Sequence, residues 1–118
     1  MKRKNILSIV VFIISTITAF SQNSKVQKVQ FKVFGNCPQC KERIEGSLDT
    51  KGVKSAEWNI DTKQMVVVYV PTKISIEQIH ALIAKVGHDT DKQKGNDSVY
   101  LTLPDCCLYR DHDNTHKD

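Results

Sequence analysis

The feature that most constrains the fold of this chain is the order in which its hydrophobic pattern changes period. Residues 29–33 alternate apolar with polar side chains, which is typical of a half-buried strand. From Pro38 the spacing becomes helical, and one face is formed by Cys40, Ile44, Ser47 and Leu48. Proline lacks an N–H and therefore suits the first turn of a helix, so we predict that a helix begins at Pro38 and ends before Lys51-Gly52.

Two further extended runs and a second helix follow. Residues 53–60 and the β-branched run 65–70 flank a short turn, which predicts a β-hairpin. Ser75 with Gln78 three residues later is a capping-box signature at the start of a helical pattern. Gly87 stands where the C-terminal glycine of that helix belongs.

For a last strand the sequence offers two candidates, 90–93 and the more apolar 99–103. Either one completes the order β-α-β-β-α-β, the split βαβ or ferredoxin-like plan of the α+β class. We therefore expect an antiparallel sheet with two helices on one face, followed by a C-terminal extension that carries two adjacent cysteines. The expected core residues are Phe31, Ile44, Leu48, Trp58, Val67, Ile79, Leu82 and Ile83.

The N-terminus has the pattern of an export signal. Three cations at 2–4 precede an apolar stretch over 6–20, and small residues at 19 and 21 suit cleavage after Ser21. We predict a signal peptide over 1–21 and a mature protein that is periplasmic or secreted. The alternative is an N-terminal membrane anchor, because residues 5–24 contain no charge.

The expected organisation is the signal peptide, a domain over 25–94 and an extension over 95–118. The chain has 17 Lys and Arg against 13 Asp and Glu, a net charge of +4, but without residues 1–21 the balance is 14 against 13. A domain that binds nucleic acid keeps its cations on the folded surface. We therefore expect no nucleic-acid partner.

The sequence Cys37-Pro38-Gln39-Cys40 lies between the first predicted strand and the first helix. The positive end of the helix dipole would face both sulfurs and stabilise thiolates there. Two soft sulfurs in an open loop favour Cu(I) or another soft ion, whereas zinc usually takes four ligands. Thiol exchange and a plain disulfide remain alternative uses of this pair.

The order and spacing of these motifs resemble a known family. The residues that carry the resemblance are Gly35 to Lys41, Gly52-Val53 after the first helix and Gly87-His88 after the second. The chain resembles the heavy-metal-associated domain over about residues 26–94. That family includes copper chaperones, modules of copper-exporting P-type ATPases and the periplasmic mercury-binding protein. The resemblance implies a metal ion held by Cys37 and Cys40 and passed by ligand exchange to a partner.

The expected ion is Cu(I), with zinc or mercury as alternatives. The expected partner is a metal-transporting membrane protein or another metal-binding domain. Transfer by ligand exchange requires no acid–base machinery, so we predict that the protein is not an enzyme.

Cys106 and Cys107 lie beyond the region of resemblance. Adjacent cysteines can bridge each other only through a strained ring, so we expect either a bridge to Cys37 or Cys40, or metal binding. Four thiolates would form a Cys₄ zinc site or a small Cu(I) cluster.

The histidines differ in their expected roles. His88 would lie near the loop that carries Cys37 and Cys40, which we call the metal loop, as a third ligand or as a hydrogen-bond donor behind a ligand. The alternative is an exposed histidine at a helix end. His80 falls on the polar side of the second helix and is expected to be solvated. His112 and His116 belong to a polar tail that we predict to be disordered.

Three functions remain in competition. The first is an exported, metallochaperone-like carrier whose candidate ligands are Cys37, Cys40, Cys106, Cys107 and His88. The second is a thiol–disulfide oxidoreductase that uses the Cys37-Cys40 pair. The third is a Cys₄ zinc structural module.

Overall fold

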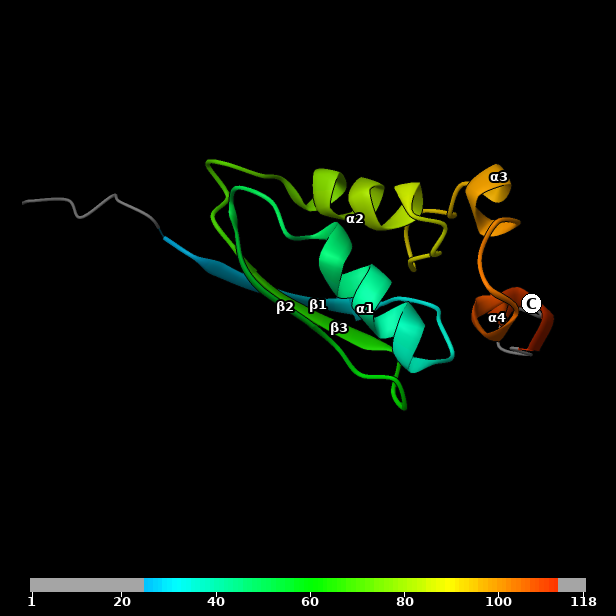
Figure 1. Cartoon of the computed structure of the whole chain (residues 1–118). Helices are drawn as coiled ribbons and strands as arrows, with labels where there is room; N and C mark the ends of the chain where they lie inside the picture. Colours follow the sequence, from blue (N-terminus) through cyan, green and yellow to red (C-terminus); the bar gives the residue numbers. More distant parts are fainter. Residues whose placement is uncertain (1–24, 113–118) are drawn as a thin grey trace, which may run out of the picture.

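The computed structural model describes residues 25–112, and the predicted signal peptide lies outside them. An antiparallel sheet has the order β1-β3-β2, built from β1 (Gln27–Lys32), β3 (Gln64–Tyr69) and β2 (Val53–Trp58). Helices α1 (Pro38–Ser47) and α2 (Ile76–Lys85) cover one face of this sheet (Figure 1). The expected α+β, ferredoxin-like arrangement is confirmed. Within residues 25–112, no helix has the length and apolar character needed to cross a membrane.

The register of the sheet places the core. Met65 of β3 lies opposite both Phe31 of β1 and Trp58 of β2, and all three side chains are buried. The helices add the buried residues Ile44, Leu48, Ile79 and Ile83, as predicted. Leu82, also expected in the core, is only partly buried at its edge.

The two helices begin where their sequence signals predict. The Cys37 sulfur accepts a hydrogen bond from the Cys40 N–H, so the first cysteine of the motif is itself the N-cap of α1. At α2, Ser75 Oγ accepts from the Gln78 N–H at 3.1 Å, and Gln78 Oε1 accepts from the Ser75 N–H at 2.9 Å. The capping box is therefore confirmed. Gly87 follows α2 with φ of 95°, a conformation that favours glycine.

The last strand is reduced to a single antiparallel bridge between Val33 and Thr90. The candidate at 90–93 is thus in the right place, but the strand predicted at 99–103 is wrong. Asn96 Oδ1 accepts from the Val99 N–H at 3.1 Å and starts the short helix α3 (Asp97–Tyr100). The apolar residues there are buried with a spacing of three, at Tyr100 and Leu103, and not in alternation.

The extension continues as the 3₁₀ turn η3 (Asp105–Cys107) and α4 (Tyr109–His112). These elements lie beyond the end of the sheet, beside the N-terminus of α1 (Figure 1). Cys107 and Tyr109 are fully buried and belong to the same hydrophobic cluster as the residues of the sheet and helices. The extension therefore shares the core of the domain, at the end that carries the cysteine motif.

Candidate metal centre

Three thiols converge at the N-terminus of α1. Cys37 is the N-cap of that helix, Cys40 lies in its first turn, and Cys107 reaches them from η3. The Cys37 sulfur lies 3.0 Å from that of Cys107 and 3.2 Å from that of Cys40, and all three sulfurs lie within 4.8 Å of one another. None of these cysteines is in a disulfide. The structure thus brings together three of the predicted ligands.

Cys106 stands at the rim of this cluster. Its sulfur is exposed and lies 3.7 Å from the sulfurs of both Cys37 and Cys107, with the Gln39 side-chain oxygen at 3.3 Å. It is therefore adjacent to the three-sulfur group but open to solvent. A thiol in this position can act as a fourth ligand or as an entry point for ligand exchange.

The thiols of Cys37 and Cys40 differ in how readily they ionise. Burial opposes ionisation of Cys37, but hydrogen bonds donated by the Cys107 and Cys40 thiols and by the Cys40 N–H lower its pKa to about 7. Burial raises the pKa of Cys40 to about 12. Near neutral pH Cys37 is therefore the more readily ionised thiol of this pair, and a metal ion that binds both sulfurs must displace the proton of Cys40.

Arg43 supplies a positive charge to the same cluster. Burial acts to lower the pKa of its guanidinium. A hydrogen bond to Cys107 and the charges of the nearby cysteines outweigh burial, so the pKa lies above its ordinary value. Its Nη1 is buried and has no hydrogen-bond partner among the described residues. Sequence reasoning did not assign Arg43 to the cysteine cluster. Its spacing of three from Cys40 was an available signal, but the position of Cys107 was not.

His88 is fully buried, so the alternative of an exposed histidine is wrong. Its Nδ1 donates to the Phe34 carbonyl at 2.8 Å, and burial lowers its pKa to about 4. Within residues 25–112, the atoms that lie close enough together to hold one ion include the three sulfurs but not His88. In this arrangement His88 supports the metal loop from behind.

The expectation that His80 is solvated is also wrong. Its side chain is 3% exposed, and its Nδ1 lies 2.6 Å from Thr90 Oγ1. The bridge at Thr90 brings the segment after α2 back across that helix, which covers a position that looks polar in sequence. His116 and the side chain of His112 lie outside the described part of the chain.

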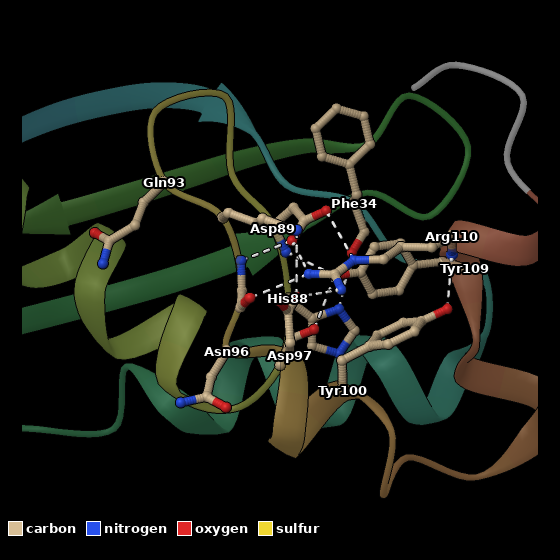
Figure 2. Close-up of polar contacts among 12 residues, drawn as sticks. Phe34, His88, Asp89, Gln93, Asn96, Asp97, Tyr100, Tyr109 and Arg110 are labelled. Carbon is tan, nitrogen blue, oxygen red and sulfur yellow. Dashed lines mark hydrogen bonds and ion pairs between the residues drawn. The ribbon is translucent and has the colours of Figure 1, made fainter. Parts of the chain in front are cut away.

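The extension is held in place by the two residues that follow Leu108 (Figure 2). The Tyr109 hydroxyl accepts from the Asp89 N–H and donates to the Gly87 carbonyl, both at 2.8 Å. Arg110 pairs with Asp89 at 2.7 Å and with Asp97 at 2.8 Å. Sequence reasoning missed this anchor because its partners are distant in the chain and carry no recognisable motif.

The comparisons with known proteins cover the part of the chain that carries Cys37 and Cys40. The family model described as "Heavy-metal-associated domain" matches residues 30–89. A zinc-transporting ATPase of Synechocystis sp. is 35% identical over 78 residues, which are 64% of this chain and 11% of the ATPase. This chain therefore spans about a tenth of the length of that curated relative.

Two solved structures have the same fold over this region. A CopZ metallochaperone is 30% identical with a TM-score of 0.52, covering 54% of this chain and 98% of its own. The N-terminal domain of a potential copper-translocating P-type ATPase from Bacillus subtilis, in the Cu(I)-loaded state, is 30% identical with a TM-score of 0.54. That match covers 63% of this chain and 95% of the solved domain.

Proposed function

Because this chain belongs to the heavy-metal-associated domain family, we propose that it is an exported, metallochaperone-like carrier of a soft metal ion, with Cu(I) as its cargo. The ion is held by Cys37 and Cys40, with Cys107 as a third sulfur ligand. The protein passes the ion on by ligand exchange and performs no catalysis. Export follows from the signal pattern at 1–21.

One observation carries this proposal: three cysteine sulfurs from two distant segments lie within 4.8 Å of one another. Thiolate sulfur is a soft ligand that selects soft ions such as Cu(I) over hard ones. Arg43, hydrogen-bonded to Cys107, offsets part of the negative charge of three thiolates and so favours their joint ionisation around an ion. The Cu(I)-loaded state of the Bacillus subtilis domain supports copper as the cargo.

The exposed rim supports transfer by ligand exchange. A thiolate from a partner can approach beside Cys106, enter the coordination sphere and displace one of the three sulfurs. The expected partner is a metal-transporting membrane protein or another metal-binding domain. Similarity to parts of two transporting ATPases supports this class of partner.

A Cys₄ zinc site is the second candidate, and Cys106 is the observation that favours it. Its sulfur lies 3.7 Å from two members of the cluster, so a small shift would bring a fourth thiolate to the ion. Zinc prefers four such ligands. The zinc-transporting relative is consistent with this alternative.

An anaerobic titration of Cu(I) into the reduced protein, in competition with a chromophoric chelator, tests the proposal. We expect one ion per chain with a Kd of about nanomolar or below. Cys37→Ser and Cys40→Ser should each remove this competition, whereas Cys106→Ser is the matched control at the exposed rim and should retain it. Failure of the unsubstituted protein to compete would overturn copper as the cargo. Strong binding of zinc that is lost in Cys106→Ser would instead establish the Cys₄ alternative.

A further inference from the structure

Cys107 lies in an element that cannot hold its own position. The turn η3 has three residues, and its N-cap, Pro104, makes no side-chain capping bond. A single short 3₁₀ turn is marginal without tertiary support. The placement of the Cys107 sulfur 3.0 Å from that of Cys37 therefore depends on what fixes the chain next to it.

Tyr109 provides the first anchor. Its ring is fully buried, stacks on His88 with centroids 5.1 Å apart and meets the Tyr100 ring edge-on at 5.2 Å. Its hydroxyl both accepts from Asp89 and donates to Gly87. A buried aromatic ring with both hydrogen-bonding roles of its hydroxyl satisfied has one well-defined position.

Arg110 provides the second anchor. Its Nη2 and Nε atoms donate to the two carboxylate oxygens of Asp89, at 2.7 and 3.2 Å. The Asp89 side chain is 10% exposed and that of Arg110 is 20% exposed, so this two-point ion pair is shielded from solvent. Paired contacts of this kind fix orientation as well as distance. Figure 2 shows the guanidinium between Asp89 and Asp97, above the ring of His88.

The same short segment, 87–89, also holds the metal loop. The Phe34 N–H donates to the Asp89 carbonyl at 2.9 Å, and His88 Nδ1 donates to the Phe34 carbonyl at 2.8 Å. Phe34 is three residues before Cys37. One segment therefore fixes the loop that carries two sulfurs and the extension that carries the third.

We infer that Tyr109 and Arg110 are positioning residues that hold Cys107 over the cysteine motif as the third sulfur ligand, and thereby set how slowly the bound ion leaves. The inference rests on the proposed function. Ligand exchange at a site closed by a third sulfur is slow until that sulfur moves away. Loss of the anchor should convert a three-sulfur site into a two-sulfur site that loses its ion faster.

The test is the rate at which the Cu(I)-loaded full chain loses its ion to an excess of chelator. Arg110→Met and Tyr109→Phe, which keeps the buried ring, should each accelerate this loss by about 10- to 100-fold, as is typical for groups that orient metal ligands. The matched control is Lys94→Met, which removes an exposed cation that also pairs with Asp97. This control should lose its ion at the original rate.

A double-mutant cycle separates positioning from general stability. In a Cys107→Ser background there is no third sulfur to position, so adding Arg110→Met should change the rate no further. X-ray absorption should count three sulfurs around copper in the unsubstituted protein and two in Arg110→Met. Circular dichroism of each variant checks that it is folded.

The two proposals fail in different ways. If the unsubstituted protein binds no ion, the proposed function is wrong. If it binds Cu(I) but Arg110→Met and Tyr109→Phe keep three sulfurs and the original rate, only the positioning role is overturned. An effect of Arg110→Met that persists in full in the Cys107→Ser background would also overturn it, because the residue would then act through overall stability.

Discussion

At the residue scale, His88 is a buried base that its surroundings keep neutral. A carbonyl oxygen cannot donate, so the contact with Phe34 requires the proton on Nδ1 and leaves Nε2 as a bare acceptor. Nε2 has no partner among the described residues. Burial is the main reason that its pKa falls from 6.5 to about 4. The packing beneath the metal loop therefore depends on an uncharged imidazole.

This dependence makes stability fall in mild acid. The imidazole of His88 takes up a proton near pH 6.5 in the unfolded chain and only near pH 4 in the folded one. The contribution of neutral His88 to the free energy of unfolding is therefore complete above pH 6.5 and is lost as the pH falls toward 4. At pH 5 the loss should be roughly 2 kcal/mol. Urea unfolding at pH 7.5 and pH 5 measures it. In His88→Phe this part of the loss should vanish, and an unchanged difference between the two pH values would contradict the assignment.

At the scale of elements, the loop between β1 and α1 is packed without spare room. A Cβ added at Gly35 would lie 3.0 Å from the Trp58 ring, 3.1 Å from Cys40 Cβ and 3.2 Å from Ile44 Cδ1. All three neighbours are buried, so each can yield only by displacing its own contacts. The glycine thus sets the distance between the loop and the helix that carries Cys40.

We expect Gly35→Ala to destabilise the fold by about 1–3 kcal/mol, the usual cost of overpacking, and to weaken Cu(I) binding because Cys40 is displaced. Gly46→Ala is the matched control, since nothing lies within 4 Å of a Cβ added there and the residue is inside α1. That change should instead stabilise the protein by about 0.5–1 kcal/mol. Urea unfolding and the chelator competition measure both quantities. Equal behaviour of the two variants would contradict the tight packing at Gly35.

Elements with a local signal were predictable from the sequence. The hairpin follows from β-branched residues around a turn, and α2 from its capping box and terminal glycine, all of which act over a few residues. The segment 99–103 was misread because a short apolar run fits a strand or a helical turn, and the Asn96 cap decided between them. His80 was misread because its cover, Thr90, comes from a different element.

In the candidate site, too, only the part with a local signal was predictable from the sequence. Cys37 and Cys40 are visible as a motif because their spacing alone brings two sulfurs to one helix terminus. The contact of Cys107 with Cys37 spans 70 residues and depends on the anchor at Asp89. Sequence reasoning could name Cys107 as a candidate ligand but could not decide between it and Cys106. The roles of Arg43 and Tyr109 require the folded extension.

At the scale of the whole molecule, the extension and the sheet share one hydrophobic core. Tyr109, from the extension, and Trp58, from β2, are both fully buried in the same cluster. Residues that share one core in a small domain unfold together. The fluorescence of Trp58, the chain's single tryptophan, should therefore report damage done in the extension.

Tyr109→Ala should lower the free energy of unfolding by about 3–5 kcal/mol, the range for removing a buried aromatic ring. Urea unfolding followed by Trp58 fluorescence measures this as a shift of a single transition to lower urea. Leu101→Ala is the matched control, because Leu101 lies in the same extension with 76% of its surface exposed, and its removal should change stability by less than about 0.5 kcal/mol. If the Trp58 transition of Tyr109→Ala stays in place, the extension melts independently of the sheet. The metal centre would then combine two sulfurs held by the stable domain with a third, that of Cys107, which leaves the site whenever the extension unfolds.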